Sequence, residues 1–175
     1  MRAARPSPGD RIVDFQAPCL DGSTFSTRRA YLRTSLLVVF THEWPCTECR
    51  AYLASIGHRS ANLLAESCRA VAVVPLGSAI VVPRLEGDES SVTLALAEAN
   101  ELHARYGFVD ERGRPHAAVV LADETGTIWQ VWSDDGQHRL PDPDDVLAWV
   151  RFLSYQCPEC WERPWWDSAR QLAGR

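Results

Sequence analysis

The chain has 175 residues, of which 46% are hydrophobic, and its formal net charge is −5. This length predicts one domain with a substantial apolar core. All 18 basic residues are arginine, which excludes Schiff-base enzymes and Walker-type phosphate loops, because both need a lysine amine. The acidic balance, without a basic cluster, argues against a nucleic-acid partner.

The chain begins MRAARPSPGD, without an apolar stretch, and no apolar run approaches the ~20 residues that span a bilayer. We therefore expect no secretory signal, no membrane association and a cytoplasmic location. In a reducing compartment, paired cysteines are more often catalytic or metal-binding than structural disulfides. Of the six cysteines, Cys19 and Cys68 stand alone and fit small buried apolar residues, so neither is assigned a role.

The N-terminal part predicts a flexible tail over residues 1–9, followed by a domain over residues 10–155. Asp10–Phe15 predicts a short strand or an extended entry. Ala17–Gly22 predicts a turn, and Ser23–Ser26 predicts a second brief strand.

The central part predicts a strand, a helix and a second strand. Leu36–Phe40 is an uninterrupted apolar run, typical of a strand that is buried on both faces. From Cys46 the apolar residues keep a helical period to about residue 67, with Gly57 as a kink. Ala70–Val74 predicts the next buried strand. This order indicates a right-handed unit with parallel strands.

The C-terminal part predicts a helix, a hairpin and a last helix. Apolar residues keep a helical period over residues 92–106, and Gly107 ends that helix. Ala117–Ala122 and Thr127–Trp132 predict an antiparallel hairpin that is joined by the turn sequence DETG. A final helix is expected over residues 145–155.

Cys46 and Cys49 form a Cys-x-x-Cys motif where the helix begins after the central strand. At positions i and i+3 the two side chains share a helix face, about 5–6 Å apart at Cβ, which is near the separation of a disulfide. The positive N-terminus of a helix favours a thiolate over a thiol. A thiolate that attacks, beside a thiol that resolves the attack, is a redox couple. Pro45 lacks a backbone N–H and suits the first helical turn.

Further residues near the motif are candidates for supporting roles. The imidazolium of His42 could lower the pKa of a thiol, and the carboxylate of Glu43 could carry protons during exchange. Both also fit exposed turn residues without a role. Trp44 is expected to shield the sulfurs. Arg50 follows the dithiol, and its side chain also fits a solvent-facing position.

A second Cys-x-x-Cys pair, Cys157 and Cys160, lies in a Cys- and Trp-rich tail over residues 156–175, where Pro158 predicts a turn. This pair fits an auxiliary dithiol, a metal knuckle or a stabilising disulfide. All four motif cysteines together would suit zinc in a non-catalytic module, which is the alternative to redox chemistry. We favour redox chemistry because the first pair follows a buried strand and opens a long helix.

The order of elements is a thioredoxin-like layout. The chain resembles the peroxiredoxin-like redoxins of the alkyl hydroperoxide reductase and thiol-specific antioxidant family. The likeness spans about residues 9–132 and is carried by the stretches GDRIVDFQAPCLDGSTFS, LLVVFTHEWPCTECR, ELHARYGF and AVVLADETGTI. It implies an α/β thioredoxin-like fold with a central mixed sheet flanked by helices. It also implies no bound organic cofactor and a thiol reductant of the thioredoxin or glutaredoxin type.

The resemblance allows two registers for the nucleophile. Counted from Phe40, the peroxidatic cysteine falls on Cys49, but the threonine three residues before it falls on Cys46, so the pattern Pro-x-x-x-Thr-x-x-Cys is absent. The thioredoxin register makes Cys46 the nucleophile and Cys49 its shielded partner. The cis-proline of thioredoxins would fall on Pro115. We expect a thiol–disulfide oxidoreductase, with a thiol peroxidase acting on peroxides as the alternative.

Overall fold

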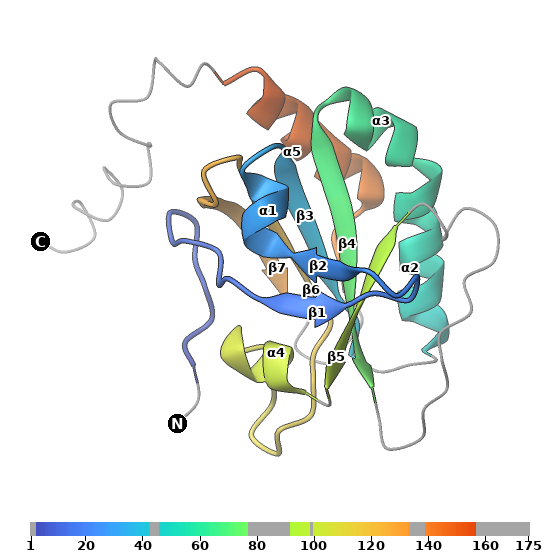
Figure 1. The fold of residues 1–175 in the computed structure, drawn as a ribbon, viewed down its shortest axis with the longest axis vertical. Helices are drawn as coiled ribbons and strands as arrows, with labels where there is room; N and C mark the ends of the chain where they lie inside the picture. Colours follow the sequence, from blue (N-terminus) through green and yellow to red (C-terminus); the bar gives the residue numbers. More distant parts are fainter. Residues whose placement is uncertain (1–2, 43–45, 77–91, 99, 134–138, 157–175) are drawn as a thin grey trace, which may run out of the picture.

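The computed structural model describes residues 3–42, 46–76, 92–98, 100–133 and 139–156 (Figure 1). Within these ranges a five-stranded sheet forms the centre, in the order β5-β4-β3-β6-β7. Its strands are β3 (Ser35–Phe40), β4 (Cys68–Leu76), β5 (Thr93–Glu98), β6 (Ala118–Ala122) and β7 (Ile128–Ser133). β3–β4 and β4–β5 are parallel, whereas β3–β6 and β6–β7 are antiparallel. The mixed sheet and the C-terminal hairpin are therefore as predicted.

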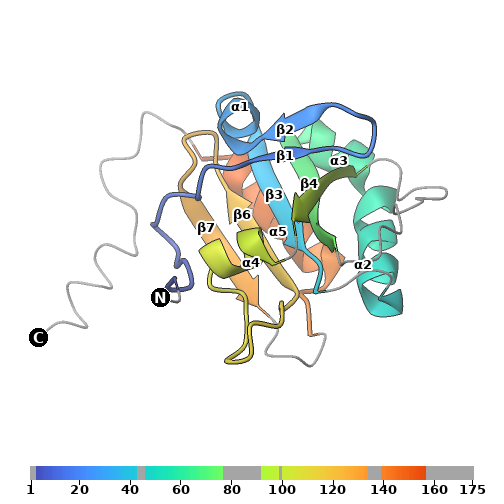
Figure 2. The ribbon, with the colours of Figure 1, turned by 60° about the horizontal axis from the view of Figure 1, so that its bottom comes forward.

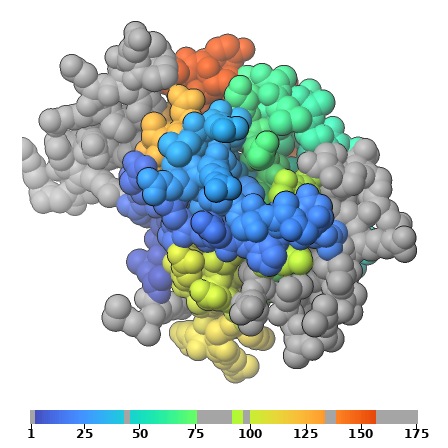
Figure 3. All heavy atoms as spheres, in the orientation of Figure 1, coloured from blue at the N-terminus to red at the C-terminus, as the bar shows by residue number. Residues whose placement is uncertain are grey.

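Helices cover both faces of this sheet (Figure 2). One face carries α2 (Thr47–His58), α3 (Ser60–Ala65) and α5 (Pro143–Ser154). The other carries α1 (Thr27–Tyr31), α4 (Glu101–Arg105) and an antiparallel ribbon of β1 (Gln16–Pro18) and β2 (Thr24–Ser26). The ribbon and α1 form a continuous outer surface (Figure 3). No helix among the described residues has the length and hydropathy to cross a bilayer.

Strand β3 contributes to both apolar cores. Leu36, Val38 and Phe40 point into the core beneath α1 and α4. Leu37 and Val39 point into the core beneath α2, α3 and α5. Because successive strand residues alternate between faces, only an uninterrupted apolar run can fill both cores. Each such side chain contributes about 1.5–3 kcal/mol when it is fully buried.

The single helix expected from Cys46 to residue 67 is wrong, because the chain forms two helices. α2 ends at His58 and α3 starts at Ser60, with Arg59 as the shared cap residue, two positions after Gly57. Arg59 donates from Nη1 to the carbonyl of Ser55 at 2.9 Å, and its Nε lies 2.7 Å from the Asp144 carboxylate of α5. These contacts accompany the break and tie it to the last helix.

The helix expected over residues 92–106 is also wrong in its first half. Thr93–Glu98 forms strand β5, and the helix is confined to Glu101–Arg105, although Gly107 does end it. A short apolar run fits a buried strand as well as a helix, so its periodicity does not decide between them. Here the free edge of β4 decides, because β5 pairs with it over six residues.

The N-terminal residues lie against the domain. Gly9 donates to the carbonyl of Ile128 at 2.8 Å, and Arg5 donates to the hydroxyl of Ser133 at 3.1 Å, both on β7.

The turn expected over residues 17–22 starts later than predicted, because Gln16–Pro18 pairs as strand β1.

Gly107 provides a test of how firmly the first residues pack. Its φ is +68°, and a Cβ there would lie 2.7 Å from the carbonyl oxygen of Ala3 and 2.9 Å from the nitrogen of Arg5. Gly113 has a similar φ of +76° but nothing within 4 Å. We expect Gly113→Ala to lose about 1–2 kcal/mol of unfolding free energy from its backbone conformation, and Gly107→Ala to lose more. Equal losses in urea unfolding would show that residues 3–5 do not pack against Gly107.

Candidate functional site

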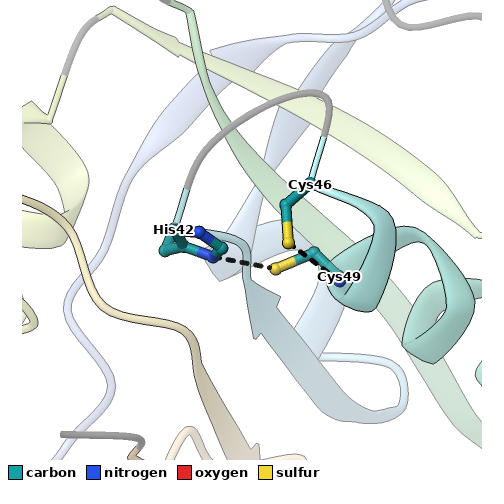
Figure 4. A group of neighbouring side chains, drawn as sticks. All are labelled: His42, Cys46 and Cys49. Carbon is teal, nitrogen blue, oxygen red and sulfur yellow. Dashed lines mark hydrogen bonds between the residues drawn. The ribbon is translucent and has the colours of Figure 1, made fainter. Parts of the chain in front are cut away.

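The dithiol lies where β3 ends and α2 begins (Figure 4). β3 ends at Phe40, His42 lies two residues later, and α2 begins at Thr47. Cys46 is the N-cap of α2, with an extended backbone, and its sulfur accepts a hydrogen bond from the backbone N–H of Cys49. A sulfur thus occupies the place that a serine or threonine oxygen takes in many helices.

Three side chains converge at this point. His42 Nδ1 lies 3.2 Å from the sulfur of Cys49, and the Cys49 nitrogen lies 3.4 Å from the sulfur of Cys46. The imidazole nitrogen and the two sulfurs all lie within 4.8 Å of one another. In addition, the Cys46 thiol donates to Glu48 Oε2 at 3.0 Å. Each cysteine therefore has its own nearby proton acceptor.

The two sulfurs differ in environment. Cys46 is 8% exposed and Cys49 is 3% exposed, and both pack with Ala117. Burial raises the pKa of Cys49 well above its ordinary value; the backbone N–H of His42 opposes this rise, while the neighbouring Cys46 and the Glu48 carboxylate add to it. Cys49 is therefore held as a thiol at neutral pH, with its proton within reach of His42.

One residue of the segment before β6 packs against the dithiol, and the expected place of Pro115 beside it stays a prediction. Pro115 forms an isolated bridge with Val109. Ala117, two residues later and just before β6, is buried in one cluster with both cysteines, and Leu140 packs against that cluster.

Some of the other residues singled out in the sequence lie within the described part of the chain, and the rest lie outside it. Arg50 lies in the first turn of α2 and is half-buried. Cys68 at the start of β4 and Cys19 after β1 are buried away from the dithiol cluster, and burial raises the pKa of Cys68 to about 12. The remaining predicted residues, Glu43, Trp44, Pro45, Cys157 and Cys160, lie outside the described residues.

His103 is a residue that the sequence analysis missed. It lies in α4, is 0% exposed, and donates from Nε2 to the carbonyl of Thr41 at 2.7 Å. Thr41 also donates from its backbone nitrogen to the Val73 carbonyl on β4. Both bonds hold the residue just before His42. The sequence carries one signal for this role, because His103 is a polar residue beside Leu102 on a helix that must bury one face.

Burial lowers the pKa of His103 to about 4, and the nearby His42 and His116 lower it further, whereas the Thr41 hydrogen bond opposes the shift. The imidazole is therefore neutral at pH 7, with the proton on Nε2. Its Nδ1 has no hydrogen-bond partner within the described residues. A neutral, fixed ring is suited to holding the end of β3 in place.

Comparison with known proteins shows a likeness to solved structures. No family model and no curated protein matches the chain. Among solved structures, AhpC of Mycobacterium bovis is 15% identical, with a TM-score of 0.74, over 91% of this chain and 100% of that chain. AhpC of Mycobacterium tuberculosis is 14% identical, with a TM-score of 0.73 and the same coverage. A reduced 2-Cys peroxiredoxin of Plasmodium vivax is 13% identical, with a TM-score of 0.70, over 83% and 81%.

These identities are low, so the likeness concerns the fold. It confirms the predicted thioredoxin-like fold and the resemblance to peroxiredoxin structures.

The buried histidine predicts a specific pH dependence of stability. Its folded-state pKa of about 4 lies below the ordinary 6.5, so the unfolded chain takes up this proton first as the pH falls. The stabilisation is complete above pH 6.5 and is lost progressively towards pH 4. Between pH 7 and pH 5 the wild type should lose about 2 kcal/mol more than His103→Gln, which keeps a donor but does not titrate. The measurement is urea unfolding at the two pH values. Equal losses of unfolding free energy in the wild type and in His103→Gln would contradict this prediction.

Proposed function

We propose that the protein is a thiol–disulfide oxidoreductase that uses Cys46 and Cys49 as its redox couple. The supporting observation is the asymmetry of the two sulfurs at the start of α2. Cys46 is the more exposed and caps the helix, whereas Cys49 is deeper and is held protonated by burial. This is the division of roles that the thioredoxin register predicts.

The geometry supports a balanced exchange. The Cys46 thiol gives its proton to Glu48, and the thiolate attacks one sulfur of a substrate disulfide, so that a mixed disulfide forms and a thiolate leaves. His42 then accepts the proton of Cys49. The Cys49 thiolate attacks the Cys46 sulfur and releases the second substrate thiol. Two electrons pass from the dithiol to the substrate, and Cys46–Cys49 becomes a disulfide.

Recycling requires a dithiol reductant, for which we propose a thioredoxin- or glutaredoxin-type protein in the cytoplasm. No bound organic cofactor is needed, because the two sulfurs carry the two electrons themselves. The same exchange run backwards returns the couple to its reduced form.

The alternative is a thiol peroxidase with Cys49 as the peroxidatic residue. The likeness to AhpC and peroxiredoxin structures favours it. The Cys49 thiolate would attack a peroxide oxygen, release water or an alcohol and become a sulfenic acid, which Cys46 would condense with as water leaves. The deep burial of Cys49 opposes this order, because the peroxide must reach the less accessible sulfur.

The two mechanisms are separated by which cysteine reacts first. At pH 7 we expect Cys46 to be alkylated faster than any other cysteine, located by mass spectrometry. Cys46→Ser should reduce disulfide turnover by at least about 100-fold, and Cys49→Ser should accumulate the mixed disulfide instead. Faster labelling of Cys49, with peroxidase activity that survives in Cys46→Ser, would favour the peroxidase.

The second Cys-x-x-Cys pair is proposed as an auxiliary dithiol. Cys157→Ser/Cys160→Ser in the full chain should leave the first couple able to oxidise and reduce, with slower recycling by the reductant. Stopped-flow tryptophan fluorescence follows both half-reactions. A folded double variant whose first couple does not react at all would place this pair in the primary site.

A further inference from the structure

We propose that His42, Cys46 and Cys49 also form a binding site for Zn²⁺, and that the bound ion holds the dithiol reduced and inactive. The inhibition rests on the proposed oxidoreductase function, whereas the binding does not. The site differs from a four-cysteine zinc module, because its three ligands come from the β3–α2 junction alone.

The distances suit this ion after small movements. Zinc bonds of about 2.3 Å to sulfur and 2.0 Å to nitrogen place neighbouring ligand atoms of a tetrahedron about 3.5–3.8 Å apart. The imidazole nitrogen and the two sulfurs lie within 4.8 Å of one another, and His42 Nδ1 lies 3.2 Å from the Cys49 sulfur. Each pair of ligand atoms therefore needs to change its separation by about 1 Å or less to reach this geometry. Within the described parts of the chain, no other three such side chains converge this closely.

The charges also balance. Each thiol loses a proton as it binds, so two protons are released and no electron is transferred. Two thiolates and a neutral imidazole around a doubly charged cation give a complex of zero net charge. Such a complex suits a site where the sulfurs are 8% and 3% exposed, whereas two bare thiolates there would carry a large desolvation cost.

The orientation of His42 favours ligation by Nδ1, because that nitrogen faces the sulfurs (Figure 4). Nε2 would then carry the ring proton. The fourth position would be taken by water or by the carboxylate of Glu48, whose Oε2 lies 3.0 Å from the Cys46 sulfur.

The same two sulfurs serve the disulfide and the metal, so the two states exclude each other. A Cys46–Cys49 disulfide has no thiolate left to bind zinc. Bound zinc, in turn, occupies the lone pairs that Cys46 needs to attack a substrate. The affinity for zinc should therefore depend on the redox state of the couple.

The experiment uses Co²⁺ as a spectroscopic probe for zinc on the reduced full chain under anaerobic conditions. We expect one Co²⁺ per chain, with a thiolate-to-cobalt charge-transfer band in the near ultraviolet, displaced by Zn²⁺ and absent from the oxidised protein. His42→Asn should weaken binding by at least about 10-fold, and Cys46→Ser and Cys49→Ser should abolish the band. The matched controls His58→Asn and Cys19→Ala should bind as the wild type does.

Several outcomes would overturn the proposal. Unchanged affinity in His42→Asn, with circular dichroism as in the wild type, would remove His42 from the site. Loss of the band in Cys157→Ser/Cys160→Ser would favour the four-cysteine site instead. Disulfide turnover that is unaffected by saturating Zn²⁺ would remove the inhibition. One outcome separates the two proposals. If the protein shows no disulfide turnover without metal but binds one Co²⁺ as expected, the metal site stands and the oxidoreductase function fails.

Discussion

The pairing of β3 between β4 and β6 is the constraint on which the rest of the structure depends. β3 is hydrogen-bonded on both edges and packed on both faces, so its position is fixed in every direction. Its carboxyl end therefore delivers the Thr41–His42 segment to the edge of the sheet where Cys46 and Cys49 lie. His103 holds that segment from the side of α4 through its bond to Thr41. The dithiol is thus built on a rigid support rather than on a free loop.

At the dithiol, burial and charge act against each other. Burial keeps Cys49 protonated, while a redox reaction requires the same sulfur to become a nucleophile. In the proposed mechanism His42 offers one solution, because it would accept the proton of Cys49 at the moment of attack. A bound cation offers another, because it replaces the proton and cancels the charge of both sulfurs. The proposed catalytic and metal-binding roles are therefore two answers to one electrostatic problem, and they use the same atoms.

The sequence was most informative where one local rule decides the outcome. The apolar run before the first Cys-x-x-Cys predicted a doubly buried strand, and the spacing of Cys46 and Cys49 placed their sulfurs together at a helix start. His42 was a predicted neighbour of the motif, and the structure adds its contact with Cys49, seven residues along the chain. His103 and Ala117 were not found, because both reach the site through packing with segments distant in the chain. Pro115 rests on the resemblance alone, and its place beside the dithiol stays a prediction.

The sequence by itself determined the strand and the helix start that carry the dithiol, and the final hairpin and helix, because hydrophobic pattern, turn residues and caps are local. Tertiary structure decided the remaining elements. Thr93–Glu98 became a strand because β4 offered it an unpaired edge, although its apolar spacing also suits a helix. The break between α2 and α3 falls at Arg59, which contacts Asp144 on a helix about 85 residues away. The thioredoxin register implies that Cys49 is the shielded sulfur, whereas the residue that packs with both cysteines, Ala117, is set by tertiary structure because it comes from a distant segment of the chain.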